Sequence, residues 1–388
     1  MSTIYFDNCA TTRPYDEVKD IVINTMTTHY ANPSALHSAG ISVERLINSA
    51  RKTIADTLNC KQDEIIFTSG GTEADNMAVL GVANAYSRKG KHIITSKIEH
   101  HAVLDCFKHL ESNGFEVSYI DVDSNGVVDF EQLKNAVRDD TILISIMLAN
   151  NETGTFQPIE KIRSISKNAI IHTDAVQAYG KYDFKNLDVD LISISGHKIH
   201  APKGIGVLAV KNGVKLSKIS FGGGQEAGIR SGTYNTEGIL GMAKAAEISY
   251  DNLYRDISYL KELCEYFKTQ LVEKIPDVCF NGENSVNVVS VSFPGVRGEV
   301  LLHTLEEKGI YVSTGSACNS KSTKISYVLD AMHIERKLAE STIRVSFSVF
   351  NTKEEIDNAI DVIVQSVAFL RKFTRRWGSK WNRLFYLN

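Results

Sequence analysis

Short apolar runs that end abruptly in polar residues recur along the first half of the chain. The five runs lie at 64–68, 92–96, 141–148, 169–174 and 190–195, and they alternate with segments in which apolar residues are spaced three and four apart. A run of four to eight apolar residues is typical of a buried strand, whereas the three-four spacing is typical of a helix. The alternation therefore predicts an α/β fold with a mostly parallel sheet.

Composition limits the classes of function. The chain has 388 residues, 43% of them hydrophobic, which is enough for a large and a small domain that share a cleft. The net charge of -3 comes from mixed acids and bases, so it indicates neither direct nucleic-acid binding nor a membrane surface. No apolar run approaches the ~18 residues of a membrane span, and the start of the chain lacks the pattern of a secretory signal, so we expect a cytoplasmic protein. The six cysteines lie far apart, which argues against structural zinc and disulfides.

Polar groups follow each predicted strand, and the carboxyl ends of parallel strands meet at one edge of a sheet, where open α/β folds place ligands. Gly71 and Thr72 open a helix after the first strand, and the N–H groups at that helix start favour a single phosphate group. The spacing matches neither a P-loop nor a dinucleotide fingerprint, and a plain turn remains the alternative. His100 follows the second strand, either as an imidazole lying flat against a ring or as a structural histidine.

The next three strands bring an amide, an acid and an amine to the same edge. Asn151 follows the third strand, Asp174 and Gln177 end the fourth, and Lys198 follows the fifth. An acid at the end of a buried strand needs a cationic or hydrogen-bonding partner. An amine, an acid, a flat ring and a phosphate turn are together the groups that bind pyridoxal phosphate.

The remaining segments carry less chemistry. The stretch 121–132 suggests a calcium loop but has Gln132 where a bidentate glutamate is needed, so we expect a turn and then a helix capped near Asp129. The glycine-rich stretch 221–233 is too flexible for a core and could cross to a second subunit. The spacing from Leu253 to Leu271 predicts one long helix, and 286–293 alternates like a strand. The basic, aromatic tail 371–388 would dock on the protein's own surface or on a partner.

Two residues in the last third are candidates for the chemistry. Cys318 has only small or polar neighbours, so it is either an exposed nucleophile or a harmless loop cysteine. Arg344 lies within an apolar strand, where an unpaired guanidinium would be costly, and it needs the carboxylate of an internal acid or of the substrate.

From about Ile4 to about Leu370, the chain closely resembles the pyridoxal-phosphate cysteine desulfurases, a family that supplies sulfur for iron-sulfur clusters and thiolated tRNA. The motifs that carry the resemblance are Thr68-Ser-Gly-Gly-Thr-Glu-Ala-Asp-Asn76, Asn150-Asn-Glu-Thr-Gly154, Ser195-Gly-His-Lys198 with Pro202-Lys-Gly-Ile-Gly206, Arg230-Ser-Gly-Thr233 and Gly315-Ser-Ala-Cys318. The resemblance implies the fold-type I architecture of the aspartate aminotransferases, with an arm at 1–15 packing toward the small domain, a large cofactor-binding domain at 16–255 and a small α+β domain at 256–388.

The resemblance also implies a role for each matching residue. Lys198 would form the Schiff base with pyridoxal 5'-phosphate, His100 would stack on its ring and shuttle protons, and Asp174 would pair with the ring nitrogen. Arg344 would bind the carboxylate of L-cysteine, and Cys318 would accept the sulfur as a persulfide. The other implied contacts are Asn151 and Gln177 to the phenolic oxygen, Asn151 also near the substrate, and Gly71, Thr72, Ser195, His197 and the neighbouring subunit's Thr233 in a homodimer to the phosphate.

Two positions depart from the family pattern, because Gln225 stands where many relatives have histidine and Cys9 stands where alanine or serine is usual. The implied partners are sulfur-acceptor proteins, either an iron-sulfur scaffold or a tRNA-thiolating enzyme. A selenocysteine lyase of the same fold is the alternative within the family. A non-catalytic scaffold is a further alternative, although Lys198, Asp174 and Cys318 are all intact.

Overall fold

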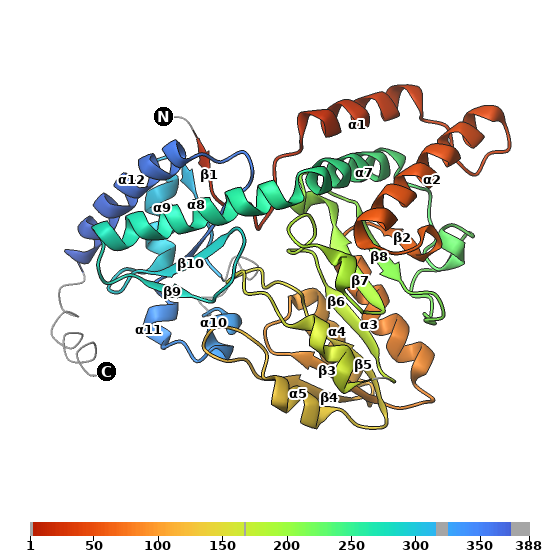
Figure 1. Ribbon diagram of the computed structural model, residues 1–388, viewed down its shortest axis with the longest axis horizontal. Helices are drawn as coiled ribbons and strands as arrows, with labels where there is room; N and C mark the ends of the chain where they lie inside the picture. Colours follow the sequence, from red (N-terminus) through yellow and green to blue (C-terminus); the bar gives the residue numbers. More distant parts are fainter. Residues whose placement is uncertain (1–2, 167, 316–324, 374–388) are drawn as a thin grey trace.

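The computed structural model describes residues 3–166, 168–315 and 325–373, and the described chain forms two lobes, one around a large sheet and one around a small sheet (Figure 1). The strands are β1 (Ile4–Tyr5), β2 (Ile65–Thr68), β3 (His92–Ser96), β4 (Glu116–Ile120), β5 (Thr141–Ser145), β6 (Ile170–Asp174), β7 (Leu191–Ser195), β8 (Gly206–Val210), β9 (Cys279–Asn281), β10 (Val288–Ser292), β11 (Ile310–Tyr311) and β12 (Thr342–Ser346). The α-helices are α1 (Asp16–Thr28), α2 (Ser38–Leu58), α3 (Gly71–Tyr86), α4 (His101–Ser112), α5 (Phe130–Ala136), α6 (Ile162–Ile165), α7 (Thr236–Asp251), α8 (Leu253–Lys274), α9 (Gly298–Glu306), α10 (Tyr327–Ala331), α11 (Arg336–Ala339) and α12 (Lys353–Arg371).

The large sheet has the strand order β2-β8-β7-β6-β5-β3-β4. Only β8 among these strands is antiparallel to its neighbours, and the other strands run in one direction. The predicted mostly parallel sheet is therefore confirmed. All five predicted strands are present in it, so their carboxyl ends share one edge.

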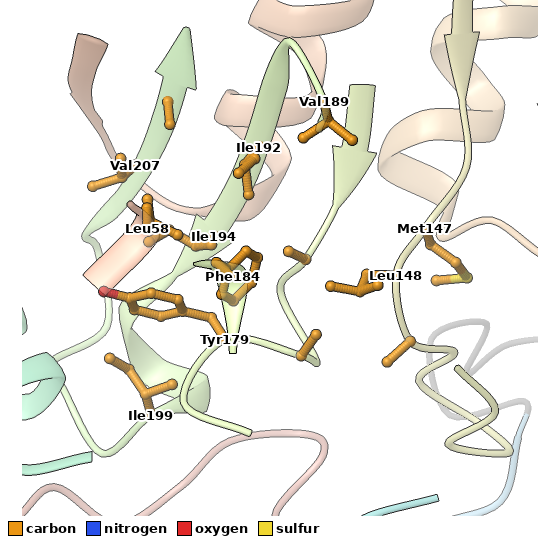
Figure 2. Packing of buried hydrophobic residues seen from close by; sticks show 14 of the residues in the cluster. Leu58, Met147, Leu148, Tyr179, Phe184, Val189, Ile192, Ile194, Ile199 and Val207 are labelled. Carbon is orange, nitrogen blue, oxygen red and sulfur yellow. The ribbon is translucent and has the colours of Figure 1, made fainter. Parts of the chain in front are cut away.

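Two apolar cores cover the two faces of the large sheet because successive residues of a strand point to opposite faces. Ile93 and Leu143 belong to the core on the face of α3 and α4, whereas their neighbours Ile94 and Ile144 belong to the core on the other face, together with residues of α1, α2 and α7. Figure 2 shows part of that second core, in which Ile192 and Ile194 of β7 lie near Tyr179 and Phe184. Burial on both faces explains why most of these strands contain adjacent apolar residues and do not alternate along their whole length.

The small lobe is built on the sheet β12-β10-β9, and its core also contains residues of α8, α9 and α12. The predicted long helix is confirmed as α8, which runs from the large lobe to the small one (Figure 1). The N-terminal arm pairs in parallel with this lobe through β1 and β11, and Phe6 is buried in its core. The divisions at 15 and 255 stay a prediction.

Smaller expectations can also be compared with the structure. A helix does follow Asp129, whose side chain accepts a hydrogen bond from the Gln132 N–H group at 2.9 Å. The basic, aromatic tail expected to dock on the protein or on a partner falls mostly at 374–388, outside the described residues. None of the helices in the described ranges combines the length and the apolar character needed to cross a bilayer.

Candidate active site

A cavity of about 340 Å³ opens at the carboxyl edge of the large sheet. It lies beyond the ends of β2, β7, β6, β5 and β3, where the sequence places its polar groups. Ten of the predicted residues line it, namely Gly71, Thr72, His100, Asn151, Asp174, Gln177, Ser195, His197, Lys198 and Arg344. Residues separated by more than 270 positions in the sequence are therefore brought to one site.

The start of α3 forms one wall of the cavity. A Cβ atom on Gly71 would lie 2.6 Å from Cγ2 of Val176 and 3.6 Å from Cβ of Ser195. Only glycine lets the helix start come this close to the loops after β6 and β7. The first N–H groups of a helix lack intrahelical partners, so this wall suits an anion such as a phosphate.

Lys198 lies in a single 3-10 turn, Gly196–Lys198, directly after β7. Its Nζ donates hydrogen bonds to the carbonyl oxygens of Cys9 and Ala10, the latter at 2.8 Å. Gln177 Nε2 donates to the same Cys9 carbonyl at 3.0 Å. The predicted arm thus reaches the site, and it holds the lysine amine through backbone oxygens.

Asp174 and His100 are the titratable pair of the cavity. Burial raises the pKa of Asp174, while the nearby charges of His100 and Lys198 oppose this effect. Asp174 Oδ1 also accepts the Val176 N–H group at 2.9 Å. Burial lowers the pKa of His100, and its Nδ1 accepts the Ala102 N–H group at 3.2 Å. A neutral His100 therefore carries its proton on Nε2.

Arg344 of β12 is only 7% exposed, and its guanidinium is shared between the arm and the loop after β5. Its Nη2 donates to Asp7 Oδ1 at 2.8 Å, and its Nη1 donates to the carbonyl oxygen of Asn151 at 2.8 Å. The internal acid expected for this arginine is thus Asp7. The Nε atom of Arg344 is buried and has no hydrogen-bond partner among the described residues, and the residue lines the cavity.

Two predicted site residues are not placed in this cavity by the described structure. Thr233 is exposed and does not line the cavity of its own chain. Cys318 lies outside the described residues, although Thr314 and Gly315, shortly before it, line the cavity.

Comparison with known proteins identifies the family. The aminotransferase class-V family matches residues 4–359. A cysteine desulfurase IscS of Methanosarcina thermophila is 45% identical over 381 residues, which cover 96% of this chain and 93% of the relative. One of Dictyoglomus turgidum is 45% identical over 375 residues, with 95% of each chain covered. The chain belongs to the cysteine desulfurase family.

Solved structures agree with this membership. A NifS-like protein superimposes with a TM-score of 0.89 at 39% identity, covering 95% of this chain and all of that structure. A structure described as SspA in complex with cysteine gives a TM-score of 0.77 at 33% identity, covering 90% of this chain. The resemblance seen in the motifs and the fold-type I architecture are therefore confirmed, and the family's cofactor is pyridoxal 5'-phosphate.

The residues of this cysteine desulfurase fit that cofactor. Lys198, Asp174, His100 and the start of α3 line one cavity, so an amine, an acid, an imidazole and a helix start are available to this cofactor together. A Cβ atom at Gly71 would collide with Val176, so glycine lets the start of α3 pack directly against the loops that line the cavity. Groups of three or more metal-binding side chains do not occur in the described parts of the chain.

Sequence reasoning missed two buried acids of the desulfurase. Asp75 of α3 lines the cavity, and it stands three residues after Thr72, between Ala74 and Asn76, at a helix position that is 1% exposed. Glu152 lies next to Asn151 and is 4% exposed, and Ser326 Oγ donates a hydrogen bond to its Oε2. Burial raises the pKa of Glu152 to about 7. An acid inside a predicted buried helix or turn was the signal available in the sequence.

Proposed function

We propose that this protein converts L-cysteine to L-alanine and keeps the sulfur as a persulfide on Cys318. The Cys318 thiolate attacks the sulfur of the substrate, so that a sulfur–sulfur bond forms and the bond from Cβ to sulfur breaks. The electron pair of that bond returns to the carbon skeleton, which is reduced and protonated to alanine, while the transferred sulfur is oxidised to the persulfide level. No outside oxidant is needed, because one part of the substrate oxidises the other.

One observation carries the proposal: Lys198, Asp174 and His100 come from three different strand ends and converge in one cavity beside the helix start at Gly71. Membership in the cysteine desulfurase family also supports this reaction. When bound there, pyridoxal phosphate supplies an electron sink that acidifies the Cα hydrogen of an attached amino acid.

The side chains of this chain would divide the proton transfers between them. Lys198 Nζ is the amine that can take the Cα proton once the substrate amine has replaced it at the cofactor. His100 presents a proton on Nε2, because its Nδ1 accepts the Ala102 N–H group, so it is suited to donate. Asp174 would be the anion that pairs with a protonated ring nitrogen: burial raises its pKa, but the Val176 N–H group and the charge of Lys198 favour its charged form.

Substrate orientation would depend on Arg344 and Asn151. The Arg344 guanidinium is fixed at two of its nitrogens by Asp7 and the Asn151 carbonyl, so it loses little side-chain freedom when it binds a carboxylate. Asn151 and Gln177 line the same cavity. Ser195, His197, Gly71 and Thr72 would hold the phosphate.

A homodimer would complete this phosphate site through Thr233. The segment that carries Thr233 is tied to its own chain by two salt bridges, Arg51 to Glu226 at 2.7 Å and Arg230 to Glu73 at 2.9 Å. Thr233 itself is exposed and away from its own cavity, which supports a contact with the site of a neighbouring subunit.

Mixed dimers test the contribution of Thr233. A dimer of one Lys198→Ala and one Thr233→Ala subunit has one intact site if Thr233 acts across the interface, and none if it acts within its own chain. We expect the mixture to recover activity in proportion to the mixed dimers, measured after affinity separation of two tags. Mixed dimers as inactive as the two parents would contradict the shared site.

We further propose that the persulfide sulfur goes to acceptor proteins for iron-sulfur cluster assembly or tRNA thiolation, with no direct contact to nucleic acid. A cytoplasmic location is supported by the free state of the described cysteines, Cys9, Cys60, Cys106, Cys264 and Cys279, as expected in a reducing compartment. A pull-down of acceptors with and without residues 371–388 would show whether the tail takes part.

Two variants test the reaction itself. Lys198→Ala should abolish the visible absorbance of the covalently bound cofactor. Cys318→Ser should keep that absorbance but release no sulfide from L-cysteine in the presence of a thiol reductant. Sulfide release by Cys318→Ser at the parental rate would rule out the acceptor role of Cys318.

A further inference from the structure

A row of buried polar side chains crosses the large sheet below the cavity, on the face covered by α3. His172 of β6 is fully buried, and its two ring nitrogens are bonded to serines on both sides, Nδ1 to Ser145 Oγ at 2.8 Å and Nε2 to Ser193 Oγ at 2.9 Å. Asp75 Oδ1 of α3 lies 3.6 Å from His172 Nε2. The proposed desulfurase chemistry assigns no role to this row.

The row adjoins Asp174, the proposed partner of the ring nitrogen. His172 and Asp174 are two residues apart on β6, so they point to the same face of the sheet. Ser193 is the register partner of Asp174 on β7, and Asp75 lines the same cavity as Asp174. Asp75 therefore lies above the strand positions that carry Asp174 and its neighbours.

Three carboxyl groups are thus buried in one region: Asp75, Glu99 and Asp174. They lie close enough to influence one another, because a negative charge on Asp174 raises the pKa of both Asp75 and Glu99. Like charges this deep in a protein cannot all be ionised without great cost. The surroundings of each acid decide which one keeps its charge.

Asp174 has groups near it that stabilise an anion. Burial raises its pKa, but the positive charge of Lys198 opposes this effect, and Asp174 accepts the Val176 N–H group at 2.9 Å. Glu99 has one oxygen, Oε1, that accepts from Ser96 Oγ and the Met147 N–H group, while its Oε2 has no partner among the described residues.

Asp75 has the opposite surroundings. Its Oδ1 is buried without a hydrogen-bond donor among the described residues. The other titratable groups that act on it from the packed elements are His172, Glu99, Asp174 and Cys106 of α4. Burial lowers the pKa of His172 to about 3 and raises that of Cys106 to about 12, so the first is neutral and the second is a thiol at neutral pH. None of the four supplies a positive charge.

We propose that Asp75 carries a proton in the folded enzyme and is a positioning residue, which as a neutral acid leaves Asp174 as the ionised carboxylate at the floor of the cavity. Burial, and then the charge of Asp174, raise the pKa of Asp75, in agreement with this assignment, although a Ser193 hydrogen bond opposes them. The statement that an ionised Asp174 faces the cofactor rests on the proposed function of this site. The statement that Asp75 carries a proton does not depend on it.

Infrared spectroscopy of the wild-type holoenzyme tests the proton directly. In protein labelled with ¹³C at the aspartate carboxyl groups, we expect the carbonyl band of a buried protonated acid at pH 7, shifted by the label. The label separates this band from that of Glu99, and its loss in Asp75→Asn but not in Asp174→Asn separates Asp75 from Asp174. The absence of any labelled acid band in the wild type would overturn the proposal in favour of an ion pair between Asp75 and His172, and this part of the measurement needs no variant to fold.

Asp75→Asn tests the same assignment through linkage. A raised pKa in the folded state means that stability falls as pH rises above the ordinary pKa of 3.8, and the asparagine variant lacks this loss. The folding equilibrium constant of the variant should therefore rise relative to wild type by up to about tenfold for each pH unit across the range in which Asp75 stays protonated. An unchanged or falling ratio would overturn the proposal.

Asp174→Asn is the matched control because it removes the acid that should be charged. It should change the visible cofactor spectrum at pH 7, whereas Asp75→Asn should leave the position of that spectrum unchanged. If Asp174→Asn has a normal visible spectrum while the labelled acid band is present, the proposed role of Asp174 is wrong. The assignment of a proton to Asp75 is then still supported. A shifted spectrum in Asp75→Asn would show that Asp75 is charged in the wild type.

Discussion

Replacement of Glu152 by glutamine should make the protein more stable at alkaline pH. Glu152 is buried between the residues on either side of the segment that contains Cys318. Ser326 Oγ donates a hydrogen bond to Glu152 Oε2, and a Cβ atom on Gly315 would collide with the same oxygen. Glutamine has nearly the same volume and keeps an oxygen that can accept from Ser326. The substitution therefore removes a titratable group and leaves the packing in place.

The size of the effect follows from the pKa of Glu152. Burial raises it from 4.5 to about 7, although the Ser326 hydrogen bond and the charge of Arg344 oppose this shift. The folded protein thus holds a proton that the unfolded chain releases. The resulting stability is fully present below pH 4.5 and is lost as pH rises through about 7. A shift of this size corresponds to about 3 kcal/mol between pH 4 and pH 8.

Urea unfolding of the cofactor-free protein between pH 4 and pH 8, at one protein concentration, measures this difference. We expect the Glu152→Gln variant and the wild type to be nearly equal at pH 4 and the variant to gain about 3 kcal/mol by pH 8. Glu299→Gln, at an exposed acid of α9, serves as the control and should show no such trend. A difference between Glu152→Gln and wild type that stays constant with pH would refute the burial argument.

Two further substitutions address the walls of the cavity. Arg344→Lys keeps the positive charge but loses the planar guanidinium that donates hydrogen bonds to Asp7 and Asn151. In steady-state assays, KM for L-cysteine should rise by roughly 10- to 100-fold, the equivalent of one or two charged hydrogen bonds. An unchanged KM would exclude a contact between Arg344 and the substrate carboxylate. Gly71→Ala places a Cβ atom 2.6 Å from Val176 Cγ2, so the helix start must move; we expect a loss of roughly 1–3 kcal/mol in thermal or urea unfolding and weaker cofactor binding by equilibrium dialysis, and a variant with wild-type cofactor affinity would contradict the role of this wall.

The fold was predictable because its strands are buried on both faces. The run 141–148 is apolar except at Thr141 and Ser145, and the two cores that receive Leu143 and Ile144 on opposite faces explain why it does not alternate between apolar and polar residues. The polar residues that follow the strands could be assigned to one edge by the geometry of parallel sheets alone. The sequence therefore indicates that Lys198, Asp174 and His100 share one edge of the sheet, and all three line the cavity at that edge.

Contacts across long sequence separations could not be predicted in the same way. Nothing local to Arg344 indicates that its acid is Asp7, 337 residues away, or that its second partner is a backbone carbonyl of residue 151. The arm delivers both Asp7 and the carbonyl groups that hold Lys198, although its sequence is short and polar like that of many ordinary termini. The type of side chain predicts that a buried arginine or lysine needs a hydrogen-bond partner. Which residue becomes that partner depends on how the two lobes and the arm pack together.

Buried acids reveal why the site needs more charge control than its motifs suggest. Asp75 and Glu152 each stand beside a residue assigned to the cofactor, and each is removed from water by the same packing that builds the cavity. A motif names the groups that touch the ligand, whereas the proton on a neighbouring acid depends on the sum of burial, donors and charges around it. Because a neutral Asp75 and an ionised Asp174 differ only in those surroundings, the charge that faces the cofactor is set by the fold around the carboxyl groups as much as by their identity.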